Sequence, residues 1–140
     1  MKAYECDAEH IYAVTLSAEL SGSYNSAILG KNLFLEEQPE KKVHVFNSKS
    51  ASGGQSLIAM KIVECEEKGL SFEEVVSEVE KYIEEMNTFF VLENLETLRK
   101  NGRLGRVKAL VASALKIKPV MGATPEGTIC QLDQARGMNK

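Results

Sequence analysis

The sequence predicts an α/β protein with a parallel sheet in its N-terminal part and a second, smaller α/β part behind it. Three observations favour this class. Short apolar or β-branched runs alternate with longer segments of helical periodicity. Small polar loops follow the first two predicted strands, as in parallel sheets that bind ligands at the strand ends. Near the C-terminus, a turn containing proline and glycine separates two β-rich runs.

The N-terminal part begins with two strand–loop–helix successions. The apolar run 11–16 predicts the first strand, and helical spacing over 24–37 predicts a helix that Pro39 ends. The run 43–46 predicts the second strand, and the helix after its loop stops at Gly69.

A third helix and a third strand complete this part. Ser71 and Glu74 form a capping-box pair that begins a helix over 72–85, and 88–92 predicts a strand. Because strands alternating with helices favour right-handed parallel crossovers, we expect this strand to join the parallel sheet.

The C-terminal part is predicted to contain two helices and one hairpin. The helices span 95–100 and 107–115, and strands at 117–121 and 128–132 flank the turn at 125–127. We place the domain boundary between residues 94 and 95, giving domains 1–94 and 95–140. Each domain has few strands for its class, so both are predicted to be truncated.

The amino-acid composition limits the binding partners and the cellular compartment that can be expected for this protein. Seventeen basic and 20 acidic residues give a net charge of −3, which supplies no positive field for nucleic acid. The 3 cysteines are scattered singly, and neither a signal peptide nor a membrane-spanning run is present. We therefore expect a cytoplasmic protein that binds no nucleic acid and does not insert into membranes. No metal or cofactor motif is present, and no catalytic set can be assembled, so we expect a binding protein and not an enzyme.

The loop between the first strand and the first helix is the leading candidate for a binding site. Ser21, Gly22 and Ser23 place hydroxyls and free backbone N–H groups at the start of a helix, where the helix dipole favours an anion such as a carboxylate. The alternative is that Ser21 or Ser23 only caps the helix, and the two roles are compatible.

A second loop of the same kind, residues 47–55, follows the second strand and contains Ser48. Parallel pairing would bring both loops to one edge of the sheet, where they could line a single site. The alternative is a solvated turn capped by Ser52. The single pair Gly53–Gly54 is too weak a signal for a dinucleotide fingerprint.

Two other groups of residues suggest other functions. The basic residues around Arg103 could dock an acidic partner, although most such clusters are solvated surface. His10 and His44 could serve a phosphotransfer subunit, although isolated histidines beside strands are more often structural. A phosphotransfer subunit and a protein-interaction module are therefore the alternative functions.

Five ordered motifs resemble the DegV family of fatty-acid-binding proteins over about residues 13–136. They are the segment 20–27, the pair 47–48 with 53–55, the segment 95–104, the segment 116–120, and Gly127 leading to Arg136 and Gly137. Members of that family are usually about twice as long. Asn47 stands where an aspartate is common, and Ser23 where a threonine is common.

The resemblance implies a Rossmann-like domain and a smaller α/β domain that enclose one long-chain fatty acid. Its acyl tail would be buried and its carboxylate held by hydroxyls, with presentation to a fatty acid kinase in some members. It makes Ser21 the matching headgroup contact and Arg136 a candidate basic residue near the headgroup. Ser23 and Ser48 are candidates from loop position. The two incomplete parts also suggest that the chain forms a homo-oligomer.

Overall fold

The computed structural model describes residues 7–92, 98, 100–103 and 117–136. It divides into two compact units, Met1–Met86 and Asn87–Lys140, which are described separately below.

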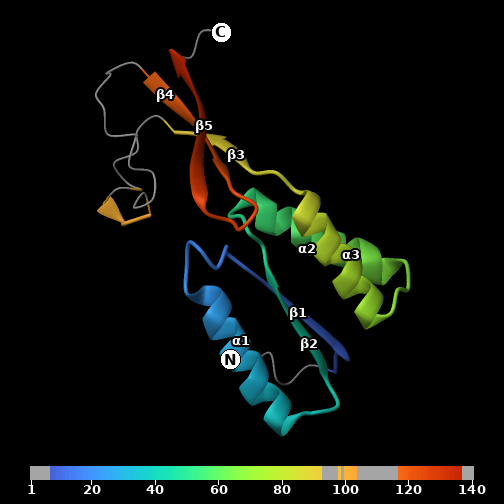
Figure 1. The fold of residues 1–140 in the computed structure, drawn as a ribbon. Coiled ribbons are helices and arrows are strands. Elements are labelled where there is room, and N and C mark those ends of the chain that lie inside the picture. The colour runs from blue at the N-terminus through green and yellow to red at the C-terminus, as the bar shows by residue number, and fades with distance from the viewer. Residues whose placement is uncertain (1–6, 93–97, 99, 104–116, 137–140) are drawn as a thin grey trace. The chain divides into compact units, whose positions relative to one another are not determined.

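The first unit is built from two parallel strands and three helices. In chain order these are β1 (His10–Thr15), α1 (Ser23–Glu37), β2 (Lys42–Asn47), α2 (Gly53–Glu67) and α3 (Phe72–Glu85) (Figure 1). β1 pairs with β2 in parallel, from His10 opposite Lys42 to Thr15 opposite Asn47. The α/β class, both strands and all three helices of this part are therefore confirmed, with the helix after β2 beginning at Gly53.

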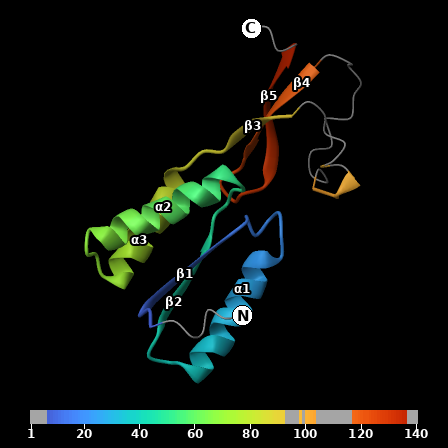
Figure 2. The ribbon, with the colours of Figure 1, turned by 180° about the vertical axis from the view of Figure 1, so that it is seen from behind.

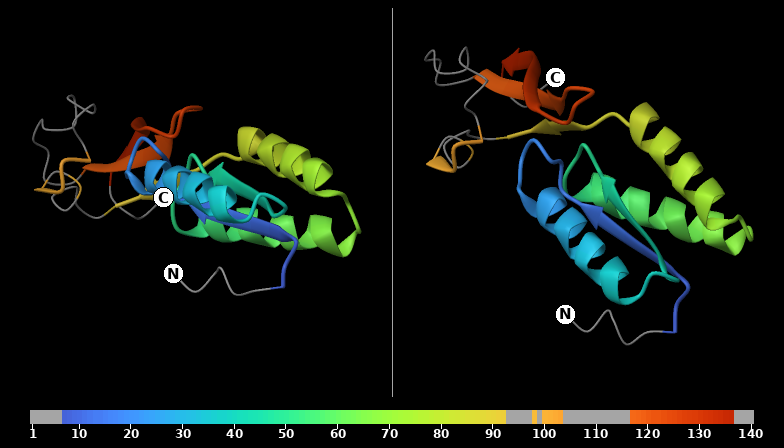
Figure 3. Two further views of the ribbon diagram at one scale, coloured as in Figure 1. Left: turned by 90° about the horizontal axis from the view of Figure 1, so that it is seen from below. Right: turned by 60° about the horizontal axis from the view of Figure 1, so that its bottom comes forward.

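The two strands separate α1 from the hairpin of α2 and α3 (Figures 1 and 2). The period of two along a strand explains this arrangement. Ile11, Ala13 and Val45 border a cleft along α1, while Phe46 points into the main core on the other face. Figure 3 shows the same layers from two further directions. The core cluster consists of Phe46, Ile58, Ile62, Cys65, Val75, Val79 and Ile83.

Local signals set the start and the buried face of α3. The Ser71 Oγ accepts from the Glu74 N–H, and the Glu74 carboxylate accepts from the Ser71 N–H at 2.8 Å. Residues Val75, Val79 and Ile83 then recur every four positions and are all buried, which places one stripe of the helix on the core.

The second unit is an antiparallel sheet in the order β3–β4–β5, with β3 at Phe89–Val91, β4 at Ile117–Ala123 and β5 at Ile129–Arg136. The predicted hairpin is confirmed. Its turn is closed by the Thr124 N–H, which donates to the Thr128 carbonyl at 2.8 Å. Gly127 has a φ of 89°, a conformation that glycine adopts without a steric penalty.

The prediction that the third strand joins the parallel sheet is wrong. Phe89–Val91 pairs antiparallel with β4, from Phe89 opposite Gly122 to Val91 opposite Val120. The reason is the helical hairpin: α2 runs back along the sheet and α3 returns, so the chain leaves α3 at the carboxyl edge of β2 (Figure 1). A strand that starts there cannot run beside β2 in the same direction without another crossing.

The first unit ends at Met86 and the second begins at Asn87. The domain boundary predicted between residues 94 and 95 remains a prediction. The predicted helix 107–115 lies outside the described residues. Of the predicted helix 95–100, only residues 98 and 100 are described, and both are helical. Among the described helices, none combines the length and the hydropathy that crossing a bilayer requires.

Candidate functional site

Two polar loops meet at the carboxyl edge of the parallel strands. We call residues 16–22, after β1, the first edge loop, and residues 48–52, after β2, the second edge loop. The Ser17 N–H donates to the Ser50 carbonyl at 2.9 Å. The Ala18 N–H donates to Oδ1 of Asn47, the last residue of β2, at 3.0 Å. The expectation that parallel pairing brings the two loops together is therefore confirmed.

The first edge loop leads into α1 through Ser21 and Gly22. Gly22 is the N-cap, and its carbonyl accepts from the Ser26 N–H at 3.0 Å. Neither Ser21 nor Ser23 is the N-cap considered from sequence, although the Ser21 Oγ accepts from the N–H of Ser23, the first residue of α1, at 3.2 Å. A hydroxyl that accepts this bond still carries a proton that it can donate to a carboxylate. No acidic residue stands in the first turn of α1 to neutralise the positive end of its dipole.

The Ser23 hydroxyl is the unusual group at this helix start. Its Oγ is buried, and it is the one buried side-chain nitrogen or oxygen of the described part for which no hydrogen-bond partner is found. A buried hydroxyl without a partner costs free energy, on the order of 1–3 kcal/mol. A polar ligand atom at this position would remove that cost.

The other predicted contacts have different surroundings. Ser48 is fully buried, and its hydroxyl donates to the Ser50 carbonyl at 3.0 Å and accepts from the Ser50 N–H at 3.2 Å. These bonds hold the second edge loop together. Arg136 is the last residue of β5, opposite Ile117, and belongs to the second unit. The ligand roles of Ser48 and Arg136 remain predictions.

Sequence reasoning missed the residues that hold the edge loops. Ser17 and Ser50 are buried, and Asn47 bonds to both loops. Gly54 allows α2 to approach Ser50, because a Cβ on this glycine would lie 2.2 Å from the Ser50 Oγ. The signal was the density of small polar residues directly after each strand, which we interpreted as possible ligand contacts, helix caps or a solvated turn.

An apolar cleft of about 420 Å³ runs between α1 and the strands of the first unit. It begins close to the proposed headgroup end, since Ser26 and Ala27 border it in the helical turn after Ser23. Its remaining lining residues are Ile11, Tyr12, Ala13, Gly30, Lys31, Phe34, Val43 and Val45. The volume falls within the usual range of about 300–1,000 Å³ for small-molecule pockets.

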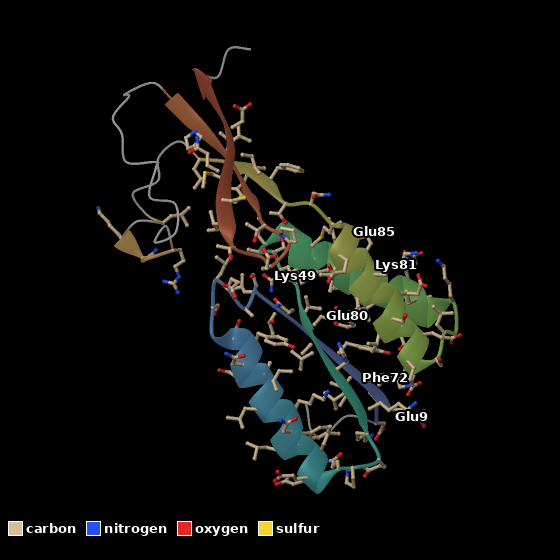
Figure 4. All side chains as sticks on the ribbon, viewed as in Figure 1. Glu9, Lys49, Phe72, Glu80, Lys81 and Glu85 are labelled. Atoms are coloured by element: carbon tan, nitrogen blue, oxygen red, sulfur yellow. The ribbon has the colours of Figure 1, made fainter. Side chains whose placement is uncertain are left out.

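Both histidines contact carboxylates on the helical hairpin. The His10 Nδ1 lies 2.9 Å from the Glu66 Oε1, and the His44 Nε2 lies 3.1 Å from the Glu80 Oε1, on the side of α3 that faces β2 (Figure 4). These contacts support the structural interpretation of both histidines over the phosphotransfer alternative.

In the basic cluster, Lys100 and Arg103 are exposed, whereas positions 99, 106 and 108 are not among the described residues. Within the described ranges, no group of three or more His, Cys, Asp or Glu residues is placed to hold a metal.

Tyr12 shares the Glu66 carboxylate with His10. Its hydroxyl donates to the Glu66 Oε1 at 2.6 Å. Burial, followed by this hydrogen bond, raises the pKa of Tyr12 well above its ordinary value. The same bond, followed by the one with His10, lowers the pKa of Glu66. This cluster begins at the opposite end of β1 from the edge loops, because His10 is the first residue of that strand.

Comparison with known proteins finds relatives over the whole chain. A family model described as an uncharacterised protein of the DegV family matches residues 1–140. A DegV domain-containing protein of Streptococcus pneumoniae strain R6 is 42% identical over 140 residues, which cover 100% of this chain and 50% of that protein.

Two crystal structures of similar proteins contain fatty acids. A DegV family protein from Ruminococcus gnavus, refined with vaccenic acid, shares 66% identity with a TM-score of 0.91, over 98% of this chain and 49% of that one. The Streptococcus pneumoniae Fatty Acid Kinase B3 protein, loaded with linoleic acid, shares 43% identity with a TM-score of 0.88, over 97% and 48% respectively. The chain therefore spans about half the length of the relatives that it matches.

Proposed function

This chain belongs to the DegV family, and from that premise we propose that it binds one long-chain fatty acid, with the carboxylate at the first edge loop. Membership confirms the resemblance carried by the sequence motifs. The observation that carries the proposal is the buried Ser23 Oγ, which lacks a partner among the described residues. It lies beside Ser21 at the positive end of a helix dipole, where a carboxylate is the favoured ligand.

We assign the acyl tail to the apolar cleft along α1. The cleft starts one helical turn after Ser23 and is bordered mostly by aliphatic and aromatic side chains. Burial of a methylene group contributes about 0.8 kcal/mol, so the tail would supply most of the affinity and the hydroxyls would fix the orientation. The proposed role is binding without turnover.

Presentation of the bound acid to a kinase extends this proposal. The similar Streptococcus pneumoniae Fatty Acid Kinase B3 protein was crystallised loaded with linoleic acid. A fatty acid kinase is therefore the proposed partner of this chain, and the cytoplasm is the compartment in which we propose that they interact. Arg136 remains a proposed basic contact for the headgroup.

A displacement titration with a fluorescent fatty acid tests the headgroup assignment. Ser21→Ala and Ser23→Ala should each weaken binding of a long-chain acid about tenfold, because a hydrogen bond to a charged group contributes about 1.5–3 kcal/mol. Ser56→Ala, which truncates an exposed serine on α2, is the matched control and should bind normally. Native mass spectrometry of the purified chain should show a co-purified acid. Unchanged affinity in both the Ser21 and the Ser23 variant would exclude the end of the first edge loop and the start of α1 as the headgroup site.

A further inference from the structure

The amide oxygen of Asn47 joins the two edge loops. It accepts from the Ala18 N–H of the first loop at 3.0 Å and from the Lys49 N–H of the second at 3.2 Å. An amide oxygen has two lone pairs, so these two bonds use its whole accepting capacity. Asn47 lies at the end of β2, a regular element, and therefore offers both loops the same fixed point of attachment.

Backbone hydrogen bonds within the first edge loop connect Ala18 to Ser21. Directly before Ala18, the Ser17 N–H donates to the Ser50 carbonyl at 2.9 Å. The Ser17 carbonyl then accepts from the Leu20 N–H at 3.0 Å and from the Ser21 N–H at 3.1 Å. The chain between the Asn47 contact and Ser21 is thus one tight turn, so a shift of Ala18 moves Ser21 with it.

The second loop is held in an unusual backbone conformation. Lys49 has a φ of 48°, in the left-handed region that residues with a Cβ rarely adopt. Its N–H is bound by Asn47, and its Nζ lies 2.5 Å from the Glu84 Oε1 near the end of α3 that carries Glu85 (Figure 4). The loop is therefore held from two sides, by β2 and by α3.

We propose that Asn47 is a positioning residue for the headgroup site, setting the separation of the two loops and so the direction of the Ser21 hydroxyl. The inference rests on the proposed function, and it adds a residue that need not touch the ligand. An aspartate at this position offers the same oxygen at the same distance from the backbone. A leucine has a similar size but accepts no hydrogen bond.

The test compares Asn47→Leu with Asn47→Asp in the 140-residue chain. Each variant is titrated with a long-chain acid and with the alcohol of the same chain length, because the alcohol shares the tail and lacks the carboxylate. Asn47→Leu should reduce the preference for the acid over the alcohol about tenfold, roughly the contribution of one hydrogen bond. Asn47→Asp should retain most of that preference. General damage to the fold would weaken both ligands together, in contrast to this pattern.

Amide hydrogen exchange separates failure of this inference from failure of the proposed function. In Asn47→Leu, the Ala18 and Lys49 amides should exchange faster than in the unmodified chain, and Asn47→Asp should protect them. If the unmodified chain itself shows no preference for the acid, the proposed headgroup site is wrong, and the exchange result alone decides whether Asn47 holds the loops. A full acid preference in Asn47→Leu, or unchanged exchange at Ala18, overturns the inference.

Discussion

Single polar side chains connect the strands of the first unit to its helical hairpin. Lys42 and Glu73 form an exposed pair, with 48% and 68% of their side chains accessible, and such pairs contribute little to stability. The bond between Tyr12 and Glu66 is less exposed and shorter, at 2.6 Å. We therefore expect Tyr12 to contribute more to the free energy of unfolding than the exposed pair does.

The lowered pKa of Glu66 predicts a pH dependence of stability. The folded chain holds Glu66 ionised below its usual pKa of 4.5, so this stabilisation is complete above that value and is lost as the pH falls through the lowered pKa. Tyr12→Phe removes the main cause of the shift. At pH 7 it should lower the free energy of unfolding by about 1 kcal/mol, a value reduced for the partial exposure of Glu66.

Denaturant unfolding between pH 7 and pH 3 measures both effects. The Tyr12→Phe chain should lose less stability than the unmodified chain as the pH falls. Tyr82→Phe is the matched control, because Tyr82 packs against the same core and, among the described residues, donates no hydrogen bond to a carboxylate. An identical pH dependence in Tyr12→Phe and in the unmodified chain would show that the bond does not form in solution.

At the scale of the element, α2 is apolar on two faces, and only one of them packs in the core. Ile58, Ile62 and Cys65 are buried, while Leu57, Met60 and Val63 are exposed. Helical periodicity alone does not separate these faces, because both repeat with helical spacing. Contact with Phe46 and with the stripe of α3 decides which face is buried.

Two substitutions on α2 test this assignment. Ile58 is 0% exposed, so Ile58→Ala should lower the free energy of unfolding by about 2–5 kcal/mol through loss of burial and the cavity that remains. Met60 is 67% exposed, so Met60→Ala should change it by less than about 0.5 kcal/mol. Chemical denaturation of both variants provides the comparison. Equal losses would mean that α2 packs in another rotation.

At the scale of the molecule, exposed apolar side chains predict self-association of the isolated chain. Leu29 and Leu33 on α1 are 61% and 55% exposed, and the outer face of α2 adds Leu57, Met60 and Val63. The described sheet of this unit has only two strands, each with one unpaired edge. Exposed apolar side chains clustered on a helix face favour association in water.

Sedimentation velocity over a range of micromolar concentrations measures this association. The sedimentation coefficient should rise with concentration, and the paired substitutions Leu57→Lys and Met60→Lys should reduce that rise. The control for charge alone is the pair Ser56→Lys and Ala59→Lys, which adds equal charge to α2 beside its exposed apolar residues. A monomer at every concentration tested would contradict the prediction.

Much of the first unit was predictable because its signals are local. The capping pair Ser71 and Glu74 and the strand runs predicted the described elements closely, and the resemblance of five ordered motifs led to the correct family. The same reasoning placed Ser21 and Ser23 at a helix start. It missed Asn47 as the link between loops, because its bond to Ala18 joins residues that lie far apart in the sequence.

The α/β class, the hairpin and the segments that carry the polar loops followed from the amino-acid sequence alone, because each depends on periodicity, capping or turn residues within a short window. The family followed from the resemblance of five ordered motifs. The structure was needed to show which face of α2 is buried and which sheet receives Phe89–Val91. It was also needed to show which polar side chains hold the loops and which described hydroxyl lacks a hydrogen-bond partner. The physical reason is that burial, strand pairing and hydrogen-bond satisfaction depend on neighbours brought together by the fold, and no local pattern specifies those neighbours.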